Sequence, residues 1–260
     1  MSLPNQPGPS RQARLTSPES RALASTTGKR PLAILPIGSV EQHGPHLPLG
    51  VDIWLATAVA DAAAEGESDM VVCEPLPYGS SEHHRSFSGT MSLAPATFIA
   101  VLVDLCTGLW HDGYLPVLMN GHGGNRAAMQ VAATTLGRDD ILTAGFSYFD
   151  LIAGEAASIL PDAASGTGHA CALETSLMMH LYAGTVRADR IPEGGTPEGW
   201  PDPHLYSGAP VNVWRRFETI NPTGVIGIPS DASAERGAAL FAVATEKTRA
   251  ALREIHTRYA

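Results

Sequence analysis

The apolar stretch Pro31-Leu-Ala-Ile-Leu-Pro-Ile-Gly38 indicates the fold class of this chain of 260 residues. It is apolar without alternation and ends at a glycine, which is typical of a strand covered on both faces in a parallel sheet. Residues 71–74, 115–119 and 141–146 form three further short runs of this kind. The sequence therefore predicts an α/β protein with a mostly parallel central sheet.

Helical patterns alternate with these strands. The expected helices cover residues 51–64, 95–110, 125–136, 172–183 and 232–255. Strand and helix alternate through residue 150, which predicts a sheet with helices on both faces. We expect one catalytic domain over residues 30–260.

Two segments depart from this pattern. Residues 1–29 are rich in Pro, Ser, Arg and Gly, and we expect them to form a mostly disordered N-terminal arm, with order beginning near Leu15 to Leu23. Residues 191–229 are rich in Pro, Gly and Trp and predict an irregular excursion. Excursions of this length usually act as lids, oligomer arms or linkers, and Trp200 and Trp214 are candidates for a lid.

Composition narrows the function classes. The chain has 17 basic and 26 acidic residues, a formal net charge of −9, and no basic run, so a nucleic-acid or anionic-membrane partner is not expected. The three cysteines are scattered and form no CxxC motif, which argues against a disulfide framework or a cysteine zinc site. No signal-peptide core or long apolar span is visible, and we expect a cytoplasmic protein.

The densest polar cluster follows the first strand, in Gly38-Ser-Val-Glu-Gln-His-Gly-Pro-His-Leu-Pro-Leu-Gly-Val-Asp52. Glu41 and His43 are two residues apart, so both point to one side of an extended segment. Asp52, at the next helix start, can turn back toward them. Carboxylates and an imidazole that converge in this way predict a divalent-metal site. The alternative is a solvated Pro-rich loop with Asp52 as an ordinary helix cap.

A second cluster, Asn120-Gly-His-Gly-Gly-Asn125, follows the third strand. His122 is a candidate fourth ligand. Gly123, Gly124 and Asn125 are candidates for contacting substrate or an oxyanion, because glycines permit close approach to backbone amides. The alternative is a purely structural turn.

A third cluster, His169-Ala-Cys-Ala-Leu-Glu-Thr-Ser176, opens a helix that must pack on the core. Glu174 either ligates a metal or balances the helix dipole. With Glu174 the candidate ligands number five, enough for two ions that share a carboxylate. Because no thiolate is among them, we expect Zn, Mn or Fe.

These motifs, in this order, resemble the creatininase family of metal-dependent amidohydrolases. The resemblance rests on residues 36–52, on Tyr78-Gly79 with His84, Phe87, Gly89 and Thr90, on residues 120–125 and on residues 169–176. It implies a three-layer α/β/α sandwich, commonly assembled as a hexamer, with two divalent metal ions per subunit.

The resemblance also implies roles for individual residues. Glu41 and His122 resemble ligands of one metal ion, and His43 a ligand of the other. Asp52 resembles the bridging carboxylate. Glu174 resembles the remaining carboxylate ligand or an acid behind it. His169 falls where the family places a histidine that handles protons for the departing amide nitrogen, and His84 is expected to contact substrate or a neighbouring subunit.

The sequence departs from creatininase at two points. The third motif lacks the glutamate with which creatininase binds its second metal, and Glu174 is the candidate replacement. The tryptophans that cover creatinine have no clear counterpart, so creatinine is an unexpected substrate. We expect a metal-bridging hydroxide to attack a small cyclic or terminal amide. Family branches that deformylate pyrimidine intermediates, or that trim the mycofactocin precursor peptide, are alternatives.

Two alternatives belong to other classes. A serine hydrolase would need a nucleophile near Ser80, Ser81 and the adjacent histidines, yet no GxSxG elbow is present. The other alternative is a catalytically inactive binding or assembly module. A complete set of five candidate ligands argues against it.

Overall fold

The computed structural model describes residues 11–25, 28–161, 168–194 and 213–260. Its centre is a four-stranded sheet with strand order β2-β1-β3-β4, in which all pairings are parallel. The strands are β1 (Leu32–Ile37), β2 (Met70–Val72), β3 (Leu115–Asn120) and β4 (Ala144–Ser147). The predicted parallel sheet is confirmed.

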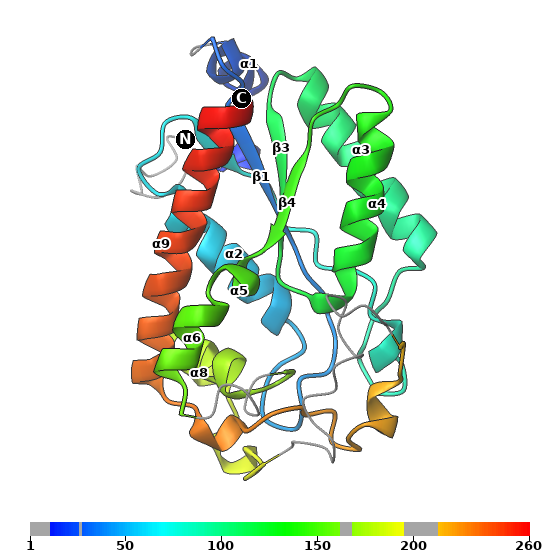
Figure 1. Cartoon of the computed structure of the whole chain (residues 1–260), viewed down its shortest axis with the longest axis vertical. Coiled ribbons are helices and arrows are strands. Elements are labelled where there is room, and N and C mark those ends of the chain that lie inside the picture. The colour runs from blue at the N-terminus through cyan, green and yellow to red at the C-terminus, as the bar shows by residue number, and fades with distance from the viewer. Residues whose placement is uncertain (1–10, 26–27, 162–167, 195–212) are drawn as a thin grey trace.

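Helices cover both faces of the sheet (Figure 1). One face carries α2 (Val51–Ala64), α8 (Ala172–Leu181) and α9 (Ala234–Tyr259), with α5 (Tyr148–Leu151) and α6 (Ala153–Ile159) beside them. The other face carries α3 (Pro95–His111) and α4 (Arg126–Gly137). Each side encloses its own apolar core against the sheet. The three-layer α/β/α sandwich is therefore confirmed.

Complete burial explains why continuous apolar runs in the sequence predicted the strands correctly. Every residue of β1 and β3 is buried, so neither strand needs polar positions. The fourth strand begins three residues later than predicted, because a turn at residues 138–140, with Asp140 at a φ of 56°, and an irregular stretch at 141–143 precede it. Ile141 still packs into the core, so its apolar side chain made the sequence resemble a strand that begins at residue 141.

Residues 11–25, within the predicted arm, contain a 3-10 turn (Gln12–Arg14) and helix α1 (Ser17–Ser25). Leu15 and Leu23 pack against the core beneath α3, and the Ser20 hydroxyl hydrogen-bonds the Tyr114 hydroxyl at 2.9 Å. These tertiary contacts hold the stretch against the domain. Residues 1–10 and 26–27 lie outside the described residues, and the domain boundary at residue 30 stays a prediction.

Short 3-10 helices make up much of the remaining described chain: Glu82–His84, Gly123–Asn125, Ala183–Thr185, Ala188–Arg190, Phe217–Thr219 and Pro229–Asp231. The last two lie at the end of the predicted excursion, whose residues 195–212, with Trp200, are outside the described part. None of the described helices is long and apolar enough to cross a membrane.

A candidate metal centre at the carboxyl ends of the strands

The candidate ligands come from loops that leave the sheet side by side. Ile37 at the end of β1 is in register with Asn120 at the end of β3. These strands point toward the lower end of the molecule in Figure 1, where the two loops and the starts of α2 and α8 lie together. Parallel strands release their loops at one edge, which is why such edges carry ligand sites.

A close backbone approach fixes the start of α2 in this edge. A Cβ atom on Gly121 would stand 2.3 Å from the Asp52 carbonyl oxygen, so only glycine fits there. The glycine of the His122 motif thus places the Asp52 side chain against the loops. This close approach gives a steric reason why the motif at residues 120–125 and the motif at residues 38–52 lie against each other.

The structure brings all five candidate ligands into one buried cluster. Four side chains are 0–4% exposed, and Glu174 is 16% exposed. Four groups of three described side chains have the spacing to hold a metal ion, and two of them consist of predicted ligands alone: Glu41 with Asp52 and His122, and His43 with Asp52 and Glu174. Asp52 is the member that both groups share.

The two oxygens of Asp52 face different imidazoles. Asp52 Oδ1 lies 3.1 Å from His43 Nε2, and Asp52 Oδ2 lies 3.0 Å from His122 Nδ1. His122 Nδ1 is also 3.2 Å from Glu41 Oε1. The geometry is that of a carboxylate able to bridge two cations.

Hydrogen bonds outside the cluster orient the two imidazoles. His122 Nε2 lies 3.1 Å from the Ser80 carbonyl oxygen, and His43 Nδ1 lies 3.2 Å from the backbone carbonyl oxygen of Glu41. Carbonyls only accept, so in the neutral rings these nitrogens carry the proton. The inward nitrogens then offer lone pairs to a metal, as is typical of ligating histidines.

Gln42 orients two further histidines in opposite senses. Its Oε1 accepts from the Gly44 amide, so its Nε2 donates to the Gly224 carbonyl and to His84 Nδ1 at 2.9 Å. His84 therefore carries its proton on Nε2, which lies 3.1 Å from Glu41 Oε1. The backbone carbonyl of Gln42 accepts a hydrogen bond from His169 Nε2 at 2.7 Å. His169 Nδ1 is therefore unprotonated in the neutral ring, and it faces Glu41.

Several polar atoms of the cluster are buried and make no hydrogen bond of good geometry with the described residues: both carboxylate oxygens of Glu41, Oδ2 of Asp52, Oε2 of Glu174 and Nε2 of His84. Imidazole nitrogens face Glu41 Oε1 and Asp52 Oδ2 at 3.0–3.2 Å, whereas no described cation faces Glu41 Oε2 or Glu174 Oε2 within 4 Å. A buried carboxylate oxygen without a partner is costly. Divalent metal ions fit this set of oxygen and nitrogen donors and would satisfy these oxygens.

The pKa values express the same attraction for cations. Burial lowers the pKa of His43, but Asp52 beside it raises that pKa to about 9. Burial also lowers the pKa of His122, and Glu41 and Asp52 outweigh it, so the pKa lies well above the ordinary value. Burial raises the pKa of the Glu41 carboxyl, yet His122 and His84 hold it well below its ordinary value. Without a metal, protons occupy the positions that a metal would take.

The pKa values of Glu174 and His169 shift in the direction that favours their neutral forms. Burial raises the pKa of Glu174 to about 7, with His43 opposing the shift and Asp52 adding to it. Burial, His43 and His84 together lower the pKa of His169 well below its ordinary value, so this imidazole is neutral at pH 7. A neutral His169 is a proton acceptor at Nδ1.

A cavity of about 520 Å³ opens beside the cluster. It is lined by Asp52, His122, His169 and Glu174, and also by His84, Gly123 and Gly124 from the predicted substrate set. Asn125 is not brought to it. The Asn125 side chain is fully buried, donates to the Gly38 carbonyl at 3.0 Å and accepts from the Ser80 amide at 2.9 Å. Its hydrogen-bonding capacity is used to hold the loops together.

Sequence reasoning missed Phe217. This side chain is 2% exposed, and its ring centroid lies 4.1 Å from that of His84 and 5.3 Å from that of His169. Trp214, a predicted lid residue, is 59% exposed and does not line the cavity. A lone Phe in a Pro-rich segment carries no periodic signal by which it could have been found.

The serine alternative finds no support in the geometry. Ser81 is fully buried, hydrogen-bonds Ser39, and does not line the cavity. Its hydroxyl lies 3.2 Å from His122 Nε2, on the outer side of that ring.

Comparison with known proteins identifies the family. The family model described as creatinine amidohydrolase, Creatininase, matches residues 13–252. The chain belongs to the creatininase family. It is therefore an amidohydrolase of that family, as the sequence motifs predicted.

Relatives within the creatininase family differ in what they are named for. The chain is 34% identical over 221 residues to a mycofactocin precursor peptide peptidase of Mycolicibacterium smegmatis, covering 82% of this chain and 80% of the relative. It is 32% identical over 238 residues to a creatinine amidohydrolase of Pseudomonas putida, covering 85% and 88%. A solved manganese creatininase superposes with a TM-score of 0.78 at 28% identity, covering 95% of this chain and 99% of the other.

Proposed function

We propose that the protein hydrolyses a small cyclic or terminal amide with two divalent ions per subunit. Glu41, Asp52 and His122 would hold one ion, and His43, Asp52 and Glu174 the other. The observation that carries this proposal is the orientation of Asp52, whose two oxygens face two different imidazoles. The oxygen and nitrogen ligand set suits Zn, Mn or Fe, and the similarity to a manganese creatininase supports it.

Divalent ions here would polarise the amide carbonyl and make a bound water acidic. The chain itself supplies the cavity and the donors around it. Gly123 and Gly124 expose backbone to the cavity, where amide groups can stabilise an oxyanion. His84 also lines the cavity, with its Nε2–H facing Glu41 Oε1.

His169 is proposed to move the proton. Its Nδ1 has no proton in the neutral ring and faces the cluster, so it can accept a proton from the attacking water. The protonated ring can then give that proton to the departing nitrogen. The hydrogen bond from Nε2 to the Gln42 carbonyl keeps the ring oriented throughout.

The substrate class is proposed from the cavity and the relatives. Short peptides, formamides and cyclic amides are the amides to test, since the relatives are named for a precursor peptide and for creatinine. Creatinine belongs in that set. However, Trp214 is exposed, and no tryptophan among the described residues lines the cavity to cover creatinine.

Metal content per subunit, measured by elemental mass spectrometry on protein purified without added metal or chelator, tests the proposal. We expect close to two equivalents, and metal-dependent turnover of an amide from the set above. One equivalent would contradict Glu174 as a ligand. No metal, and none taken up on titration, would overturn the mechanism in favour of a binding module.

We also infer from the family resemblance that the protein forms a homo-oligomer, a hexamer in the family's usual form. The cytoplasmic location expected from the sequence stays a prediction. Described side chains such as Met91 and Trp54, which are 52% and 37% exposed, are compatible with subunit contacts. Light scattering coupled to gel filtration measures the assembly directly.

A further inference from the structure

One wall of the cavity carries a cation that the metal chemistry does not use. Arg126 is the single Lys or Arg among the described residues that line the cavity. Around it the wall is apolar and is formed by Phe149, Ala153, Ala156, Ala157 and Leu173. The Arg126 guanidinium carbon lies 5.1 Å from the centroid of the Phe149 ring.

The fold has little need of an arginine at this position. Arg126 is the first residue of α4, and the helix dipole disfavours a positive charge at a helix start. Its ion pair with Asp150 is open to solvent, since the Asp150 side chain is 55% exposed. Such an exposed pair contributes little to stability. A purely structural role therefore accounts poorly for this residue.

The guanidinium also keeps donors in reserve. Arg126 Nη2 donates to Asp150 Oδ1, whereas Nε is buried and has no hydrogen-bond partner among the described residues. The planar guanidinium presents its donors in a fork that matches the two oxygens of a carboxylate. Asp150 takes a donor of Nη2, and none of the described residues accepts a hydrogen bond from Nη1, so this part of the fork is left for a ligand in the cavity.

We propose that Arg126 determines specificity by binding a carboxylate of the amide substrate. The substrate class is an acyl amino acid or short peptide whose free carboxylate reaches Arg126 and whose apolar side chain rests on Phe149 and Leu173. Its amide then extends toward the buried cluster on the other side of the cavity. This inference rests on the proposed amidohydrolase site and adds the chemical class of its substrate.

Ligand-observed NMR with N-acetyl-leucine and N-acetyl-leucinamide tests the inference on the metal-loaded protein. The two probes differ only in the carboxylate, and the spectra report binding and turnover separately. We expect the acid to bind about tenfold more tightly than the amide or better, as for a charge-assisted hydrogen bond. Arg126→Gln should abolish that preference, and Arg126→Lys should restore only part of it.

Two further variants separate binding from structure. Asp150→Asn breaks the ion pair but keeps the guanidinium, so it should strengthen binding of the acid, whereas a structural role predicts weaker binding of both probes. Arg138→Gln, at the exposed end of the same helix, is the matched control and should change nothing.

Equal binding of the two probes, a preference that survives Arg126→Gln, or no binding of either probe at millimolar concentration would overturn the inference. Metal content and metal-dependent turnover of other amides are measured independently. Failure of the carboxylate subsite is thus distinguishable from failure of the metal centre.

Discussion

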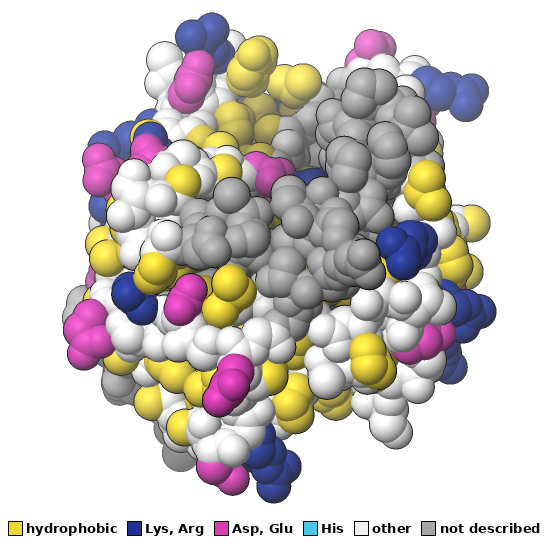
Figure 2. Space-filling model, turned by 60° about the horizontal axis from the view of Figure 1, so that its bottom comes forward, with side chains coloured by type: hydrophobic (Ala, Val, Ile, Leu, Met, Phe, Trp, Pro, Cys, Tyr) yellow, Lys and Arg dark blue, Asp and Glu magenta, His cyan; other side chains and the backbone are white. Residues whose placement is uncertain are grey.

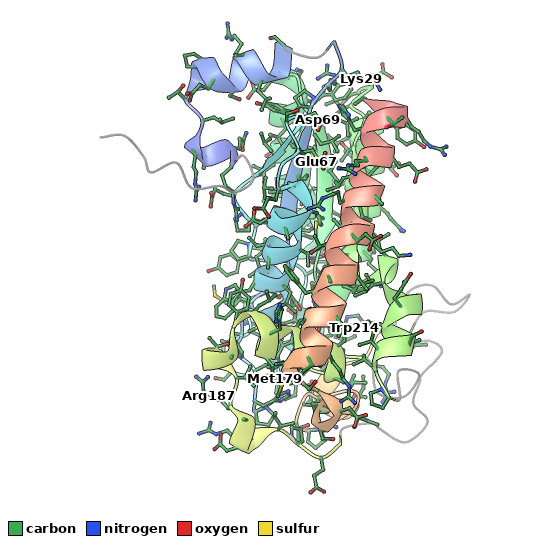
Figure 3. The ribbon with its side chains drawn as sticks, turned by 90° about the vertical axis from the view of Figure 1, so that its left-hand side faces the viewer. Lys29, Glu67, Asp69, Met179, Arg187 and Trp214 are labelled. Atoms are coloured by element: carbon green, nitrogen blue, oxygen red, sulfur yellow. The ribbon has the colours of Figure 1, made fainter. Side chains whose placement is uncertain are left out.

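At the amino end of the sheet, Glu67 and Asp69 pair with basic side chains of α9, whereas at the carboxyl end Glu41 and Asp52 face imidazoles. Arg253 Nη2 lies 2.6 Å from Glu67 Oε1, and His256 Nδ1 lies 2.8 Å from Asp69 Oδ2. Figure 3 shows Glu67 and Asp69 with Lys29 near one end of α9, far from Met179 and Trp214 toward the other.

The difference lies in burial and in the kind of partner. At the amino end the carboxylates are partly exposed and the arginine is permanently charged, so their pairs are complete but weak. At the carboxyl end the carboxylates are almost fully buried, and no described Lys or Arg forms an ion pair with them. The charge balance at this end is left for bound cations to supply.

The surface around the carboxyl end is mixed in charge. Figure 2 views the molecule from that direction and shows acidic and basic side chains scattered among the described residues rather than gathered in one patch. Among the described residues, the concentration of carboxylates and imidazoles therefore lies in the buried cluster.

The largest expected effect comes from removing the shared carboxylate. Asp52→Asn keeps the size of the side chain but removes the charge that faces both imidazoles, so both ions should be lost and turnover should fall by about 10³-fold or more. Metal analysis and amide hydrolysis measure this. A variant that retained two equivalents of metal would contradict the bridging role of Asp52.

Next in size is the effect of metal removal on stability. Ions that bind only the folded state add about 2.7 kcal/mol to the free energy of unfolding at a free concentration of 100 Kd. We therefore expect chelation to lower the calorimetric Tm of the wild type and to leave Asp52→Asn almost unaffected. An unchanged wild-type Tm after verified metal loss would show that the cluster is balanced without ions.

A smaller effect is expected at the amino end. Glu67→Gln removes the charge paired with Arg253 and should cost about 0.2–1 kcal/mol in the free energy of unfolding, less at high salt. Metal content and turnover should stay at wild-type values, so this variant is also the control for Asp52→Asn. Loss of metal from Glu67→Gln would mean that the two ends are coupled.

The smallest effect concerns the thiols. Burial raises the pKa of Cys73, Cys106 and Cys171 to about 12, so at pH 8 almost no thiolate is present in the folded protein. Ellman's reagent should react with none of them until the protein is denatured. Selective reaction of Cys171, which lines the cavity, would reveal that the carboxyl end opens more readily than the rest.

Local sequence patterns were sufficient to predict most of the fold. The helix predicted over 51–64 matches α2 because its bounds follow from nearby residues, and β1 and β3 were legible because both are buried throughout. Helix α1 was not predicted, since Leu15 and Leu23 are ordered by contacts with a core formed elsewhere in the chain.

The site divides in the same way. Glu41, His43, Asp52 and His122 lie together at one sheet edge, where strand ends and spacing indicated them, and their role as metal ligands stays a prediction. The contact of Phe217 with His84 and the orientation of Asn125 away from the cavity were beyond sequence reasoning. Both depend on packing between segments distant in the chain, as does the proton position on each imidazole.

The Gln42 hydrogen bond to the Gly224 carbonyl has a consequence for how such an enzyme can change. Gly224 has a φ of 76°, and a Cβ there would lie 2.1 Å from Gln42 Oε1, so the backbone must be glycine to pass this close. The segment before Gly224 can change for a new substrate while this carbonyl, together with the Gly44 amide, still determines which nitrogen of His84 carries the proton. Substrate range and the protonation of His84 can therefore evolve separately, provided that these two backbone groups stay in place.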